Sequence, residues 1–131
     1  KYLPKTEADL NKSRTAVNLP LMRYADVLLL LAETLNERNR PADAIPLINE
    51  VRKRADMPAL PLNLAANEVK KRIEHERIVE FALENTRFYD LRRWGKGKEA
   101  LQAVGRNSFD PAKHNFYPVP LLEITSNYKI N

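Results

Sequence analysis

Apolar side chains recur at helical spacing through most of the chain, and no segment shows the alternating pattern of a strand. Residues 1–18 are polar and weakly patterned, so we expect a loop there. Five helices follow, separated by proline, glycine and asparagine residues that break or end helices. The predicted helices span about residues 21–39, 43–55, 64 or 68 to 84, 87–94 and 99–104, the third being capped by Asn63 or Asn67.

The ends of the later helices carry residues that tolerate the left-handed backbone conformation. Asn85 is predicted to stop the third helix, and Gly95 and Gly105 the fourth and fifth. Thr86 can cap the fourth helix through its side chain. Pro46 lies within the first turns of the second helix, so we expect that helix to start late or to kink.

Each of the first two helices has an apolar stripe that predicts its buried face. The pattern therefore predicts helical hairpins of roughly the length of a tetratricopeptide repeat, although the signature residues of that repeat are missing. The stripes consist of Tyr24, Val27, Leu28, Leu31 and Leu35, widened by Leu30, in the first helix, and of Ala44, Ile48, Val51 and Ala55 in the second.

The tail after residue 107 holds three prolines and is predicted to run extended over the helices. The fold class is thus all-α, with tetratricopeptide-like helical hairpins and an extended, proline-containing C-terminal tail. We expect residues 1–131 to form a single domain or a segment of a longer protein. The apolar anchors predicted in the tail are Phe116, Tyr117, Val119, Leu121 and Ile124.

Composition narrows the function classes. The 131 residues contain no cysteine, which excludes disulfides, thiolate metal sites and cysteine nucleophiles within them. The apolar run 27–32 is too short to span a membrane. The net charge of +5 is concentrated in residues 87–98, which hold five basic residues and one Asp. No basic stripe extends beyond that cluster, so we expect no nucleic-acid binding.

The third helix carries a mixed-charge stripe in line with Val69 and Ile73. Three glutamates at four-residue spacing could suggest a glycosidase pair, but nearby arginines keep carboxylates ionised and neighbours on one helix do not face each other. We expect instead an internal ion network, because buried charges must pair. The predicted members are Arg23, Glu33, Arg52, Glu76, Arg77, Glu80, Glu84, Arg87, Asp90, Arg92 and Arg93, with Arg54 as a further candidate.

The two histidines, His75 and His114, are isolated, and neither has a neighbour at metal-ligand spacing. We therefore expect no metal site, no cofactor and no catalytic residue. Trp94 and Tyr117 are the two aromatic residues that we consider as candidates for ligand binding, since a sugar needs an exposed ring face.

Four stretches resemble the C-terminal portion of the SusD/RagB family. They are LMRYADVLLLLAE at 21–33, INEVRKRA at 48–55, ERIVEFALENTRFYDLRRW at 76–94 and NFYPVPLLEI at 115–124. Their order and spacing match the family, and the matching region covers nearly all of residues 21–131. Asn85 stands where a glycine is common in the family.

This resemblance implies a non-enzymatic protein that binds glycans or other nutrients at the bacterial outer-membrane surface. It implies an outward-facing lipoprotein, with its lipid anchor outside this segment, that delivers the nutrient to a SusC-like TonB-dependent transporter. This chain would then be mainly scaffold, and the exposed apolar stripes expected on the first two helices would be covered by other parts of the protein. The alternative is a helical-hairpin scaffold for protein–protein interaction without direct ligand binding.

Overall fold

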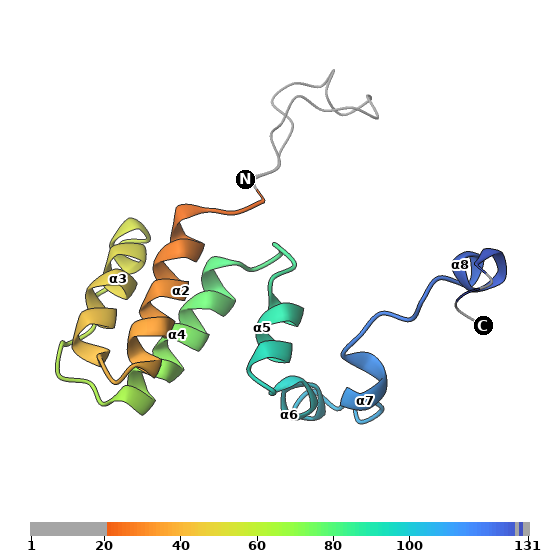
Figure 1. Cartoon of the computed structure of the whole chain (residues 1–131). Coiled ribbons are helices and arrows are strands. Elements are labelled where there is room, and N and C mark those ends of the chain that lie inside the picture. The colour runs from red at the N-terminus through yellow and green to blue at the C-terminus, as the bar shows by residue number, and fades with distance from the viewer. Residues whose placement is uncertain (1–20, 128, 130–131) are drawn as a thin grey trace, which may run out of the picture. The chain divides into compact units, whose positions relative to one another are not determined.

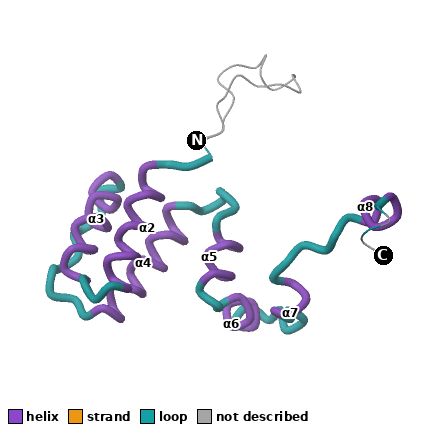
Figure 2. Tube along the Cα trace, viewed as in Figure 1, coloured by secondary structure: helices purple, strands orange, loops and turns teal. Residues whose placement is uncertain are grey.

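The computed structural model describes residues 21–127 and 129, and the loop expected over residues 1–18 lies outside them. Every regular element in the described ranges is a helix, which confirms the all-α class (Figure 2). The chain divides into two compact units, residues 1–80 and 81–131. The helices are α2 Tyr24–Glu37, α3 Pro41–Arg54, α4 Ala66–Glu80, α5 Arg87–Arg93, α6 Gly97–Gln102, α7 Pro111–His114 and α8 Leu121–Ser126.

The first unit is a bundle of α2, α3 and α4, in which α2 and α3 form a hairpin and α4 packs against both (Figure 1). Aliphatic side chains from all three helices form its core, which excludes water and supplies most of its stabilisation. The buried apolar residues of this unit are Leu28, Leu29, Ala32, Ala44, Ile45, Ile48, Val51, Leu60, Val69 and Ile73.

The buried face of α2 differs from the predicted one. Tyr24, Val27 and Leu31 are exposed, whereas Leu29 and Ala32 are fully buried. The prediction was wrong because residues 27–32 are all apolar and cover every face of the helix, so spacing alone cannot select the face that packs. For α3 the prediction was closer, since its buried side chains include three of the four predicted ones, with Ala55 exposed.

The second helix begins earlier than predicted. Pro41 occupies its first turn, where the fixed φ of proline suits a helix and its missing N–H costs nothing. Pro46 then lies inside the helix. Its missing N–H would have bonded the carbonyl of Ala42 in the preceding turn, and Ala42 is exposed, so water can satisfy that carbonyl.

Left-handed residues end α2 and α3, as Asn39 has φ 57° and Asp56 has φ 54°. After α2, the N–H of Arg40 bonds the Leu35 carbonyl at 2.9 Å, and the N–H of Asn39 bonds Asn36 at 3.0 Å. This pair of bonds is the Schellman motif, which satisfies carbonyls at the end of a helix. The connector after α3 is then fixed by Asn49, whose side chain accepts from the Leu60 N–H at 2.7 Å and donates to the Leu60 carbonyl at 3.0 Å.

The third predicted helix is shorter than expected, because α4 ends at Glu80 and a run of turns follows. Leu83 and Asn85 both adopt positive φ, of 67° and 61°. The left-handed conformation predicted for Asn85 is confirmed. That of Leu83 was not foreseen, because leucine carries no signal for it. Asn67 lies inside α4, so it does not cap the helix.

The second unit consists of short helices with few buried side chains. Among its described residues only Phe81 and Asp90 are buried. Gly95 and Gly105 adopt positive φ, of 68° and 78°, as predicted for helix stops. Thr86 precedes α5 without a side-chain capping bond, so its predicted capping role was wrong.

The tail is less extended than predicted, since it contains the short helices α7 and α8. Pro111 is the first residue of α7, where proline is tolerated, and Pro120 directly precedes α8 as its N-cap residue, so neither proline prevents its helix. The Asp110 side chain also caps α7 by accepting from the Ala112 N–H at 3.0 Å. Four predicted anchors are exposed in the structure, namely Phe116, Tyr117, Val119 and Leu121.

Candidate functional site

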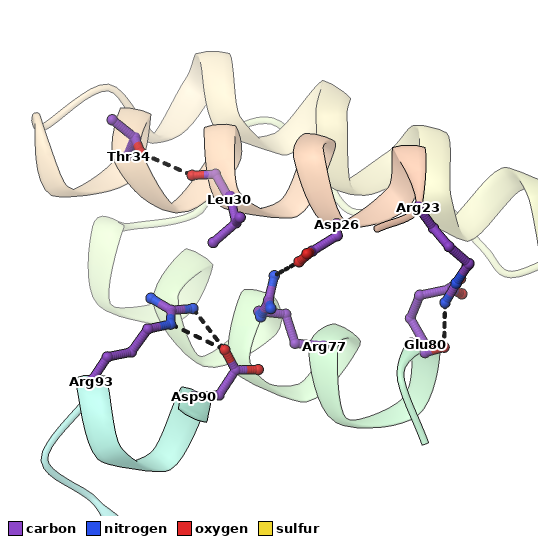
Figure 3. Close-up of polar contacts among 8 residues, drawn as sticks. All are labelled: Arg23, Asp26, Leu30, Thr34, Arg77, Glu80, Asp90 and Arg93. Carbon is purple, nitrogen blue, oxygen red and sulfur yellow. Dashed lines mark hydrogen bonds and ion pairs between the residues drawn. The ribbon is translucent and has the colours of Figure 1, made fainter. Parts of the chain in front are cut away.

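Charged side chains of α4 form a cluster of salt bridges with residues of α2 and α3 in the first unit. Besides the exposed pair Lys70–Glu37, seven residues join α4 to the α2–α3 hairpin through salt bridges, and we call these seven the ion layer. Figure 3 shows part of it, with Arg77 pointing toward Asp26 and Arg23 toward Glu80. The ion layer consists of Arg23, Asp26, Arg52, Arg54, Glu76, Arg77 and Glu80.

Glu76 pairs with α3. Its Oε2 accepts from Nη1 of Arg52 at 2.8 Å, and the two side chains are 9% and 13% exposed. Arg52 also donates through Nε to the Pro58 carbonyl at 2.9 Å, so one guanidinium connects α3, α4 and the connector between them. Because both charges are largely removed from water, neither can lose its partner without a large cost.

Glu80 is held from two sides at the end of α4. Arg23 donates to its Oε1 at 2.5 Å and to its backbone carbonyl at 2.9 Å. Arg54 donates to its Oε2 at 2.5 Å. Arg23 therefore also satisfies one of the carbonyls that the end of a helix leaves without an internal partner.

Arg77 is 4% exposed and donates through Nη1 to Oδ1 of Asp26 at 2.7 Å. Asp26 was not among the predicted network residues. Its position three residues after Arg23 in the first turn of α2 was the available signal, because that spacing places both on one helix face. Glu33, which was predicted, lies half-buried on α2.

The ion layer is suited to stabilising the packing of α4 against the hairpin. Glu76 and Glu80 lie one turn apart on one helix, and each accepts short hydrogen bonds from arginine. Both carboxylates are therefore engaged in holding α4 against α2 and α3.

The predicted arginines of the second unit have two kinds of partner, a carboxylate and aromatic rings. Asp90, which is buried, accepts from Arg93 at 3.0 and 3.1 Å (Figure 3). The guanidinium of Arg92 lies 4.3 Å from the centre of the Phe116 ring, and that of Arg87 lies 6.0 Å from the Trp94 ring. These are cation–π geometries. Glu84 is half-buried in the turn before α5.

The two aromatic candidates have different surroundings. Trp94 is half-buried, and the guanidinium of Arg93 lies 4.9 Å from its ring centre, which occupies part of the ring face. Tyr117 is 79% exposed, and its ring lies 5.9 Å from that of Phe88. Tyr117 is therefore the more accessible of the two.

The two histidines lie in different settings, one on the helix surface and one in a local hydrogen bond. His75 is exposed on α4, and Nδ1 of His114 accepts from the Asp110 N–H at 2.8 Å, across the start of α7. Within the described ranges, no group of three or more acidic, histidine or cysteine side chains could hold a metal ion.

Two cavities lie along α3 in the first unit. One, of about 350 Å³, is formed where α2 begins, and its walls include Tyr24, Glu50 and Arg54. The other, of about 530 Å³, lies between α3 and the connector, with Met57 and Leu62 in its wall. Glu50 lines both cavities. Sequence reasoning found neither of them, because the first requires α2 and α3 to pack together and the second requires the connector to fold back against α3.

No helix in residues 21–127 is both long and apolar enough to cross a membrane.

Comparison with known proteins gives one consistent result. The sequence model described as the SusD family matches residues 1–130. Three proteins of Formosa agariphila are similar: SusD-like protein P2, 33% identical over 89% of this chain; SusD-like protein P38, 34% over 75%; and SusD-like protein P25, 36% over 84%. The matches cover 25%, 21% and 22% of those proteins, so this chain spans about a quarter of their length. No solved structure matched.

Proposed function

The chain belongs to the SusD family, and on this basis we propose that it is part of a non-enzymatic protein that binds glycans or other nutrients at the bacterial outer-membrane surface. The observation that carries the proposal is the family match over residues 1–130. The bonding of Glu76 and Glu80 to arginines supports the non-enzymatic part of it, because these carboxylates are engaged in packing.

We further propose that the bound nutrient passes to a SusC-like TonB-dependent transporter, and that this chain contributes mainly scaffold. The ion layer supports a scaffold role, since it fixes three helices to one another through buried charges. The protein would face outward as a lipoprotein of the cell outer membrane. Because the 131 residues contain no cysteine, the anchoring residue would belong to a part of the polypeptide outside them.

The second candidate function is a helical-hairpin scaffold that binds another protein surface and no nutrient. The exposed face of α2 favours it, because Tyr24, Val27 and Leu31 lie at helical spacing and are 68%, 45% and 46% exposed. A contiguous apolar helix face of this kind is typical of a surface covered by another chain or segment.

A glycan array probed with the complete gene product, combined with purification from the native membrane, separates the two functions. Saturable binding to one class of glycan supports nutrient binding. Co-purification of a barrel transporter, with no glycan or other nutrient bound, supports the protein–protein scaffold. Hydrolysis of a polysaccharide that disappears in Glu80→Gln would contradict both and show an enzyme.

A further inference from the structure

The smaller cavity of the first unit has features that suit a ligand. It measures about 350 Å³ and is formed by the N-terminal end of α2 and the C-terminal half of α3. Leu28 and Val51 supply apolar wall, and Tyr24, Glu50 and Arg54 supply polar and aromatic groups. Small-molecule sites typically combine mainly apolar walls with a few placed polar groups, and this volume lies at the lower end of their usual range.

Tyr24 is the first residue of α2 and is 68% exposed, so it takes little part in the core. An exposed tyrosine combines a ring face, which carries negative potential, with a hydroxyl that can donate or accept. The C–H groups on one face of a pyranose are weakly positive and pack on such a ring, while its hydroxyls point to the rim.

Glu50 and Arg54 lie one turn apart on α3 and supply that rim. Within the described part of the chain, the Glu50 carboxylate has no hydrogen-bond or salt-bridge partner, and it is exposed. Arg54 donates to Glu80, yet its side chain is 57% exposed. A guanidinium has five N–H donors, so further donors stay available. Vicinal hydroxyls can donate to the carboxylate and accept from the guanidinium.

The second cavity extends the surface beyond one sugar ring, because Glu50 lines both cavities. Three basic and two acidic side chains line the two cavities, namely Arg23, Lys53 and Arg54 against Glu50 and Asp56. Arg23 and Arg54 both bond Glu80, so three acidic side chains offset the three basic ones. Balanced charge favours a neutral ligand. An extended peptide is less suited, because helical walls offer no strand edge with which its backbone could pair.

We propose that these adjoining cavities form a subsite for a neutral oligosaccharide, with Tyr24 as the stacking platform and Glu50 and Arg54 as hydroxyl-binding groups. The inference rests on the proposed function, and it assigns part of the ligand contact to this chain. It does not involve Trp94 or Tyr117.

The test measures binding of maltohexaose, laminarihexaose and cellohexaose to the complete gene product by calorimetry, with a galacturonate oligomer and a casein digest as comparison ligands. For the hexasaccharide that binds, Tyr24→Ala should raise Kd about tenfold or more, as for a central contact residue. Tyr24→Phe should retain most of the affinity, and Glu50→Gln should weaken binding several-fold. Matched controls outside the cavities, Tyr89→Ala and Glu99→Gln, should leave Kd unchanged.

Thermal unfolding of each variant must match the wild type, so that a lost affinity reports the site rather than the fold. Hexasaccharide binding that Tyr24→Ala and Glu50→Gln leave unchanged would overturn the subsite while nutrient binding by the protein stands. Absence of binding to every saccharide would overturn the subsite and the glycan form of the proposed function together. Binding of the digest alone, lost in Tyr24→Ala, would assign the cavities to peptide instead.

Discussion

Replacing Arg52 by methionine tests whether the ion layer stabilises the first unit. The substitution keeps an unbranched apolar stem but removes the charge that bonds Glu76 at 2.8 Å. It also removes the Nε donor to the Pro58 carbonyl. The Glu76 side chain, 9% exposed, is then left as a largely buried carboxylate without its cation.

The expected loss is large for a single substitution. Removing one partner of a buried ion pair costs about 3–5 kcal/mol, and we expect the lower end here because both side chains keep some contact with water. In a unit of this size, 1 kcal/mol shifts Tm by about 4–8 °C, so Arg52→Met should lower Tm by about 12 °C or more. The double variant Arg52→Met/Glu76→Met removes both charges and should recover most of the loss, since an apolar pair can replace a buried ion pair.

Urea unfolding followed by far-UV circular dichroism gives the free energies of the wild type, both single variants and the double variant. Lys53→Met is the matched control, because Lys53 is a neighbouring basic residue that is exposed. If Arg52→Met destabilises no more than Lys53→Met, the pair does not stabilise the unit. If the double variant is as unstable as Arg52→Met, the loss comes from packing or from the hydrogen bond to the Pro58 carbonyl, and not from the uncompensated Glu76 charge.

Three further changes test other parts of the structure. Asn49→Ala removes both hydrogen bonds to Leu60 and should cost about 2 kcal/mol in urea unfolding; faster proteolysis within the connector should accompany it, and unchanged cleavage would contradict the fastening role. Leu83→Gly relieves a left-handed leucine that is 97% exposed and should raise stability by about 0.5–1 kcal/mol, a destabilisation showing instead that Leu83 has packing partners. The hydrogen bond to Glu37 raises the pKa of Lys70, so the contribution of this pair is present while Lys70 is protonated and is lost as pH rises through the raised pKa. Above about pH 10 the free energy of unfolding of the wild type should therefore fall more than that of Glu37→Gln, by about 0.5 kcal/mol or less because the pair is exposed.

Local signals predicted helix positions better than helix faces. Asn85, Gly95 and Gly105 end turns with positive φ as expected, because their conformational freedom is a property of the residue itself. Leu83 carries no such property, so the early end of α4 could not be predicted. The buried face of α2 depends on how α3 and α4 pack, and six consecutive apolar residues leave that choice to tertiary structure.

In the candidate site, too, local sequence predicted some features and tertiary packing decided the others. Helical spacing places Glu76 and Glu80 on the face of α4 that carries Val69 and Ile73, and the structure has them there. Which cation each one bonds is decided by contacts between residues 24 to 57 positions apart. The bond between Asp26 and Arg77 likewise joins residues 51 positions apart. The cavity beside Tyr24 was missed because it exists only once α2 and α3 are aligned.

The Asp26–Arg77 bond also has a consequence for the choice of register between α4 and the hairpin. If α4 slid by one turn, Glu80 could take the place of Glu76 with no change of charge, so those two glutamates tolerate the shifted alignment. Asp26 would then face Phe81 in place of Arg77, and a carboxylate with 18% side-chain exposure would lose its cation. That mismatch costs several kcal/mol. Arg77, which lies between Glu76 and Glu80 in the sequence, thus restricts this repetitive charge pattern to one alignment of α4 with the hairpin.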